Sequence, residues 1–202
     1  MQQTEFNYVL TLTSGKNHED ISMFNPEVHY LFRDRVFKDI LDSFNGRAIR
    51  VFQVGAIESL KDGFRLGSGW SDIFWGSYIK KHGGELFVVD LDLDHICNSS
   101  FMGQQLKYPI HLQFGDGTQM IDKGFDVYYL DGADISYADD AYYQTLNQFK
   151  KIEGTNSIVL VDDVPTKAKK LKEYVDAKAD TENWIVKEYS CGNGMMTIDM
   201  RK

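Results

Sequence analysis

The sequence contains little cysteine and has no long apolar run. Its two cysteines, Cys97 and Cys191, provide neither a disulfide framework nor the closely spaced ligand pairs of a zinc site. No apolar stretch approaches the ~18 residues of a membrane-spanning helix, and the first residues do not combine a basic segment with an apolar one. We therefore expect a cytoplasmic protein that neither spans a membrane nor is secreted.

Positive charge is also scarce. The chain has 22 Lys and Arg residues against 30 Asp and Glu residues, which gives a formal net charge of -8. An acidic surface repels phosphate backbones, so nucleic acid is not an expected partner. The one basic stretch, residues 167–172, is predicted to be the solvated face of a helix.

Two common phosphate-binding motifs are missing. No glycine-rich turn leads to Gly-Lys-Ser/Thr, so there is no P-loop. The dinucleotide fingerprint is incomplete, because Asp72 stands where a third glycine should follow Gly67 and Gly69. These absences favour an adenosine cofactor of another kind.

The segments that are present alternate between strand and helix. Short apolar runs predict strands at residues 49–54, 86–89, 110–114, 126–130, 157–161, 184–189 and 195–200. Helical spacing or capping residues predict helices at residues 26–44, 71–81, 94–106, 118–123 and 137–152, and from Pro165 onward. This order predicts an α/β fold: a Rossmann-like, doubly wound sheet of about seven strands, mostly parallel, with a C-terminal antiparallel β-hairpin.

With 43% hydrophobic residues and no linker, the 202 residues are expected to form one domain. Within it, residues 1–48 would be an N-terminal helical cap segment and residues 49–202 the core. The N-terminal helix could also pair subunits into a homo-oligomer.

Acidic residues follow four of the predicted strands. Asp90, Asp116 and Asp131 each follow one strand, and Asp162-Asp163 follows the fifth. A single aspartate at such a place is often only a helix N-cap. Parallel strands, however, bring all of these acids to one edge of the sheet, where carboxylates repel unless a cation or ligand hydroxyls lie among them.

Spacing separates the roles of these acids. Asp90 lies 21 positions after Gly69 (90 minus 69), the usual interval between a glycine loop and an acid that binds ribose hydroxyls. Asp131, Asp162 and Asp163 follow predicted neighbouring strands and could share one Mg²⁺, which prefers oxygen ligands. Such an ion could hold a substrate oxygen and stabilise it as an oxyanion.

Over residues 50–202 the sequence resembles class I S-adenosylmethionine (SAM)-dependent methyltransferases, most closely the metal-dependent O-methyltransferases of the catechol and macrocin types. Val54-Gly55-Ala56 resembles the first glycine motif, and Gly115-Asp116-Gly117 resembles the turn beside the adenine. Leu130-Asp131-Gly132 and Val161-Asp162-Asp163 resemble the two metal motifs.

The resemblance implies a set of site residues. The implied cofactor contacts are Gly55, Ala56, Gly69, Trp70, Ser71, Asp90, Leu91, Asp116, Gly117 and Asp131. Asp131, Asp162 and Asp163 would bind the metal, with Asp131 and Asp134 as the catalytic residues. Ser71 corresponds to the serine that contacts the methionine carboxylate of the cofactor.

The sequence departs from the family pattern at two places. Gln53 stands where the first motif has an acid, and Glu58, within an apparent insertion at residues 57–66, is a candidate replacement. Asp134 stands where the catechol type has its lysine base, which leaves Asp134, His29 and His111 as candidate bases.

The expected function is therefore Mg²⁺-assisted transfer of a methyl group from SAM to a hydroxyl of a small molecule. The acceptor could be a sugar, a phenol or a natural-product intermediate. One alternative is a methyltransferase-like protein that binds a ligand or partner without turnover. Another is a nucleotide-sugar glycosyltransferase that uses Asp90-Leu91-Asp92 as a metal-binding acid pair.

Overall fold

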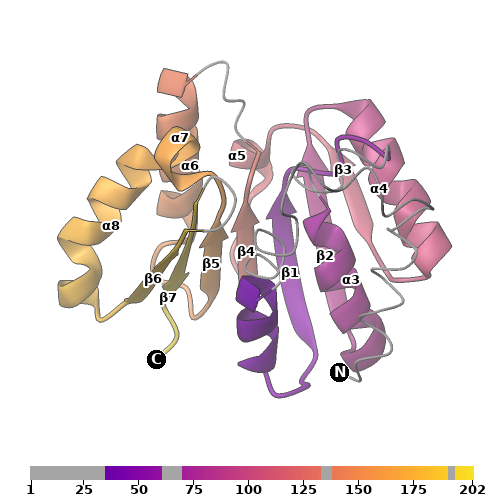
Figure 1. The fold of residues 1–202 in the computed structure, drawn as a ribbon, viewed down its shortest axis with the longest axis horizontal. Helices are drawn as coiled ribbons and strands as arrows, with labels where there is room; N and C mark the ends of the chain where they lie inside the picture. The colour runs from indigo at the N-terminus through magenta and orange to yellow at the C-terminus, as the bar shows by residue number, and fades with distance from the viewer. Residues whose placement is uncertain (1–34, 61–69, 133–137, 191–193) are drawn as a thin grey trace, which may run out of the picture.

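The computed structural model describes residues 35–60, 70–132, 138–190 and 194–202, which fold around one seven-stranded sheet. The strand order is β3-β2-β1-β4-β5-β7-β6 (Figure 1). The strands are β1 Ile49–Val54, β2 Gly84–Asp90, β3 His111–Phe114, β4 Val127–Leu130, β5 Ile158–Val161, β6 Ile185–Tyr189 and β7 Met195–Asp199. The first five are parallel, β7 is antiparallel to β5, and β6 is antiparallel to β7, so that β6 and β7 form the C-terminal antiparallel hairpin of the predicted fold class.

The helices alternate with the strands as predicted. They are α3 Ser71–His82, α4 Leu93–Leu106, α5 Gly117–Met120, α6 Ala138–Ile152, α7 Val164–Lys167 and α8 Lys169–Glu182. A further helix covers residues 35–42, and its predicted beginning near residue 26 lies outside the described part of the chain. No helix among the described residues is long and apolar enough to cross a lipid bilayer.

Two predicted helices differ from those observed. The helix predicted at residues 118–123 is the single turn α5, because Ile121 adopts an extended conformation. The helix predicted after Pro165 is interrupted at Ala168, so that α7 ends at Lys167 and α8 begins at Lys169. The break changes the direction in which Lys167 points relative to the rest of the basic stretch.

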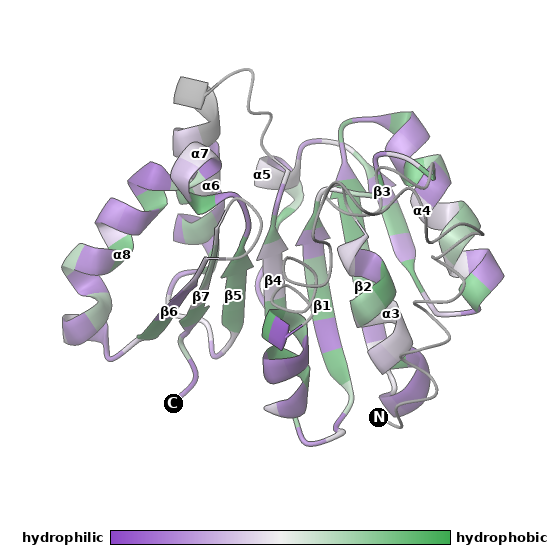
Figure 2. Ribbon diagram, viewed as in Figure 1, coloured by the Kyte–Doolittle hydropathy of each residue, from purple (hydrophilic) through white to green (hydrophobic). Residues whose placement is uncertain are grey.

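The central strands of the sheet are buried on both faces, as their apolar sequences predicted. One face packs against the 35–42 helix, α3 and α4, and its buried side chains include Val51 and Tyr129. The other face packs against α6 and α8, with Phe52 and Tyr128 among its buried side chains. Figure 2 shows the result, with apolar central strands and a largely hydrophilic α8. Successive residues of one strand therefore pack into the hydrophobic cores on opposite faces of the sheet.

Candidate active site

Backbone hydrogen bonds join the carboxyl ends of neighbouring strands into one edge. The residue after a strand donates its N–H to the strand beside it in the following pairs: Gly55 to Val89 (2.9 Å), Gly115 to Asp90 (2.8 Å), Asp131 to Val54 (3.1 Å) and Asp162 to Leu130 (3.3 Å). The predicted acids therefore lie along one edge of the sheet, where open α/β folds bind their ligands.

Glycines allow three loops to approach the end of β1. Gly55 has a φ of +97°, and a Cβ placed on it would lie 2.9 Å from the backbone oxygen of Asp131. A Cβ on Gly117 or Gly132 would lie 2.5 or 2.2 Å from Cγ1 of Val54. No residue with a side chain fits at these positions without displacing its neighbours, so the backbones of the three loops pack closely together. This closely packed backbone at Gly55, Gly117 and Gly132 is called the cradle below.

Asp90 fixes the loops on either side of it. Its Oδ2 accepts a hydrogen bond from the Ala56 N–H (2.7 Å), and its Oδ1 accepts one from the Asp92 N–H (2.8 Å). Nδ1 of His95, a residue that the sequence did not single out, lies 3.3 Å from Oδ2. Each carboxylate oxygen has a second lone pair, so Asp90 can still accept hydrogen bonds from ligand hydroxyls.

Apolar side chains lie beside Asp90. Leu91, a predicted cofactor contact, is 60% exposed, and Phe114 is 58% exposed. Phe114 pairs with Asp90 in the sheet register, so the two side chains lie on the same face. Exposed apolar groups next to a hydrogen-bonding acid suit a flat ring attached to a ribose. Phe114 was missed because the end of a strand gives no sequence signal of exposure.

The turn after β3 holds the predicted residues Asp116 and Gly117. The Asp116 carboxylate accepts a hydrogen bond from the Thr118 N–H (2.7 Å) and so caps α5. Gln53, which replaces an acid in the family pattern, is buried and donates to the Gly55 carbonyl oxygen (2.6 Å). Both side chains therefore hold the backbone of the cradle in place.

The beginning of α3 carries two buried polar side chains. Both Ser71 and Asp72 are buried, and the Ser71 hydroxyl lacks a hydrogen-bond partner within the part of the chain that the structure describes. Burial raises the pKa of Asp72 from 3.8 to about 7, an effect that Ser99 nearby offsets only in part. Half-buried Trp70 precedes the helix, and Gly69 lies outside the described residues. A hydroxyl donor without a partner at a helix N-terminus is suited to an anionic ligand group.

Two of the three acids of the predicted metal site contact a lysine. Nζ of Lys167, the last residue of α7, lies 3.0 Å from Oδ1 of Asp131 and 2.9 Å from Oδ2 of Asp163. Burial by itself would lower the pKa of Lys167, but the two carboxylates outweigh burial and raise it above its ordinary value. Lys167 is therefore an ammonium ion held between the ends of β4 and β5.

Tyr129 connects the remaining acid to this pair. Its hydroxyl lies 2.7 Å from Oδ2 of Asp162 and 3.1 Å from Oδ2 of Asp131. Tyr129 and Asp162 are buried. Because a phenol has one proton, the shorter contact marks Asp162 as its main acceptor. Asp131, Asp162, Asp163, Tyr129 and Lys167 are called the carboxylate–lysine network below.

This arrangement does not fit the predicted Mg²⁺ site. In the described ranges of the chain, no group of three or more His, Cys, Asp or Glu side chains is placed to hold a metal ion. The predicted ligands Asp131 and Asp163 face the Lys167 ammonium instead. An ammonium at hydrogen-bond distance from both oxygens repels a divalent cation at the same place.

The prediction that Lys167 belongs to a solvated helix face was wrong. Its side chain is only 12% exposed, whereas that of Lys170 on α8 is 41% exposed. The reason is the break at Ala168, which ends α7 with Lys167 directed at the acids. The pairing has a local signal, since Asp163 and Lys167 are four positions apart.

Other predicted residues are placed less favourably or lie outside the described residues. His111 begins β3, three residues before the carboxyl end, and stacks on Phe87, so the structure removes it as the base. Asp134 and His29 lie outside the described residues. Asp92 caps α4 by accepting hydrogen bonds from two backbone N–H groups through its Oδ1.

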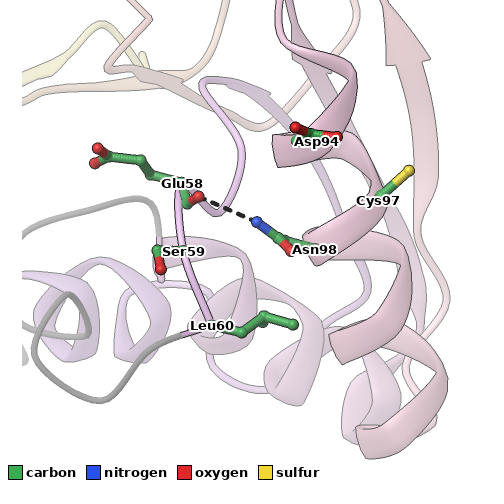
Figure 3. Close-up of a pocket in the computed structure, with 6 residues that line it drawn as sticks. All are labelled: Glu58, Ser59, Leu60, Asp94, Cys97 and Asn98. Atoms are coloured by element: carbon green, nitrogen blue, oxygen red, sulfur yellow. Dashed lines mark hydrogen bonds between the residues drawn. The ribbon is translucent and has the colours of Figure 1, made fainter.

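An open hollow of about 520 Å³ lies between α4 and the segment after the cradle (Figure 3). Its lining residues are Glu58, Ser59, Leu60, Asp94, Cys97 and Asn98. The Asn98 amide donates to the carbonyl oxygens of Ile57 and Glu58, both at 3.1 Å, and the Glu58 carboxylate points away from Asn98. The hollow contains none of the predicted cofactor contacts.

Comparison with known proteins identifies the fold. No protein-family profile and no curated protein sequence matches the chain. Among solved structures, the Podospora anserina methyltransferase PaMTH1 bound to S-adenosylhomocysteine (SAH) is 13% identical with a TM-score of 0.55, covering 100% of this chain and 97% of that chain. The SAM-bound magnesium protoporphyrin IX methyltransferase of Synechocystis PCC 6803 is 12% identical with a TM-score of 0.61. The match covers 99% of this chain and 92% of that chain.

A caffeoyl-CoA O-methyltransferase-like protein from Staphylococcus aureus is 12% identical with a TM-score of 0.56, covering 96% of this chain and 98% of that chain. Together with the sheet order, these similarities show that the chain has the fold of the class I SAM-dependent methyltransferases.

Proposed function

We propose that the protein is a SAM-dependent methyltransferase that methylates a hydroxyl group of a small molecule. The observation that carries this proposal is the backbone cradle at Gly55, with Asp90 beside it and the unpartnered Ser71 hydroxyl at the start of α3. The neighbours with bound SAM or SAH support the choice of cofactor.

The residues at this edge match the parts of SAM. The free lone pairs of Asp90 would accept hydrogen bonds from the ribose hydroxyls, and Leu91 with Phe114 would contact the adenine. The Ser71 hydroxyl would donate to the methionine carboxylate, which the α3 N-terminus also favours. Because its pKa is raised to about 7, Asp72 carries less negative charge near neutral pH than an ordinary aspartate and repels that carboxylate less. When bound, SAM supplies an electrophilic methyl group: its S–CH₃ bond breaks as the bond to the acceptor forms, leaving SAH.

The carboxylate–lysine network supports an oxygen acceptor. Asp131 lines the cradle with its backbone oxygen and contacts Lys167 with its side chain, so the network is adjacent to the proposed cofactor site. N–H donors and carboxylates can orient a hydroxyl of a sugar, a phenol or a natural-product intermediate and keep it near the methyl group. The O-methyltransferase-like protein from S. aureus is consistent with this acceptor class.

Titration of the purified protein with SAH, by calorimetry and by thermal shift, tests the cofactor. At about 100 times the dissociation constant, binding adds roughly 2.7 kcal/mol, or about 5–10 °C for a domain of this size. Asp90→Ala should weaken SAH binding, while Asp180→Ala, which removes an exposed acid of α8, should not. Absence of SAH binding to the wild type would refute the proposal.

Transfer of labelled methyl groups from SAM to a panel of catechols, simple phenols and sugars then tests the reaction. Turnover with an alcohol or phenol is the expected result. SAH binding without turnover on any acceptor class would favour the non-catalytic alternative instead.

A further inference from the structure

We propose that the ammonium group of Lys167 takes the place of a divalent cation in this site, so that methylation proceeds without Mg²⁺. For the reaction, the inference rests on the function proposed above. For the position of the positive charge, it rests on the contacts of the carboxylate–lysine network alone.

The first argument is the position of Nζ. It lies between oxygens of Asp131 and Asp163, which come from the ends of neighbouring strands, at 3.0 and 2.9 Å. A Mg²⁺ ion bound to the same two oxygens at about 2.1 Å would lie within a few ångströms of Nζ. Lysine and metal therefore exclude each other here, both by space and by charge.

The second argument is charge. Asp162 is buried, the side chains of Asp131 and Asp163 are only 11% and 14% exposed, and Tyr129 supplies one proton between Asp131 and Asp162. Such a group requires a positive charge to remain ionised. In the described structure that charge comes from Lys167.

The third argument is the strained backbone of Asp163. It adopts a left-handed conformation with a φ of 52°, which is uncommon for a non-glycine residue. The strained residue caps α7 without a side-chain capping bond, and its carboxylate contacts Lys167 instead. Strain of this kind concentrates at functional sites.

One N–H group of the Lys167 ammonium is available to a substrate. An ammonium has three N–H groups, and only two acceptors, Asp131 and Asp163, contact it among the described residues. The third N–H would donate to the acceptor oxygen. During transfer the O–CH₃ bond forms as the S–CH₃ bond breaks, the hydroxyl proton passes to water, and Lys167 keeps its protons.

Binding of Mn²⁺ alone, followed by electron paramagnetic resonance, tests the inference on the full-length protein. The variants are Lys167→Ala, the matched control Lys170→Ala on α8, and the double variant Lys167→Ala/Asp162→Asn. We expect Lys167→Ala to bind Mn²⁺ at least about 100-fold more tightly than the wild type, because a unit positive charge next to the ion has been removed. Lys170→Ala should match the wild type, and the double variant should lose the gained binding.

Two results would overturn the inference. One is Mn²⁺ binding to the wild type that Asp162→Asn abolishes, a test that holds even if Lys167→Ala fails to fold. The other is a folded Lys167→Ala variant that binds Mn²⁺ no more tightly than the wild type, as expected if the lysine is only a structural ion pair. SAH titrations of the same samples keep the tests separate, because loss of SAH binding contradicts the proposed function without changing the Mn²⁺ result.

Discussion

The buried carboxyl group of Asp72 should make the stability of the protein depend on pH in an unusual direction. Its pKa is raised from 3.8 to about 7 because the group is fully buried at the start of α3. Between these two values the folded state holds a proton that the unfolded state has released. The free energy of unfolding therefore falls as pH rises from about 4 to about 7, and this contribution is constant above pH 7.

The size of the effect follows from the shift. A difference of 7 minus 3.8, at about 1.36 kcal/mol per unit, corresponds to roughly 4 kcal/mol over the whole window. From pH 5.5 to pH 8 the expected loss is about 2 kcal/mol. In Asp72→Asn the side chain keeps its shape but cannot ionise, so the loss should disappear.

Urea unfolding of the wild type and Asp72→Asn, followed by tryptophan fluorescence at pH 5.5, 6.5, 7.5 and 8, measures this difference. The stability of Asp72→Asn relative to the wild type should increase by about 2 kcal/mol across the series. Asp180→Asn on the exposed side of α8 controls for the loss of one negative charge. A constant difference between Asp72→Asn and the wild type at all four pH values would show that Asp72 is not a buried, proton-binding group.

Three further substitutions test the site. Tyr129→Phe removes the hydroxyl between the carboxylates of Asp131 and Asp162 and should lower the free energy of unfolding by about 1–3 kcal/mol, measured by urea denaturation. A loss below about 0.5 kcal/mol would contradict the contacts described. Gly132→Ala places a methyl group against Val54 and should lower the free energy of unfolding by about 1–3 kcal/mol in the same urea experiment. An unchanged free energy of unfolding would mean that the backbone of the cradle can move to accommodate a side chain. Asp90→Asn keeps the shape of the side chain but loses one acceptor oxygen and should weaken SAH binding about 10-fold in calorimetry; unchanged affinity would remove Asp90 from the ribose site.

Most of the fold follows from local features of the sequence. The central strands are short apolar runs because both of their faces are buried, and the acids that end them mark the edge where the loops meet. These signals depend on residues close together in the chain, so β1, β2, β4 and β5 were predicted within two residues of their observed ends. The C-terminal hairpin was also predicted, whereas the insertion of β7 between β5 and β6 was not, since it depends on pairing across the sheet.

The site was predicted only where position along a strand determines the role. Asp90, Asp131 and Asp162 follow their strands and therefore reach the common edge. The role of Tyr129 could not be predicted in this way, because a buried strand tyrosine looks like core whether or not its hydroxyl reaches the edge. Its ring packs against Phe37 and Trp75, while its hydroxyl contacts two carboxylates.

Lys167 shows the limit of the sequence most clearly, and it changes the chemistry expected of the site. The sequence contains the three acids of a metal site, but it does not reveal that one helical turn ends at Lys167 and a new helix begins after Ala168. The turn of the chain at that point determines whether the charge lies in solvent with Lys170 or among the acids. Because a fixed ammonium and a bound Mg²⁺ cannot share the same two oxygens, three acids at one edge of a sheet are not sufficient to infer a metal. A cluster of carboxylates can bind a metal ion only where no lysine or arginine side chain already lies among its oxygens. The position of the nearest such side chain therefore decides between the two cases.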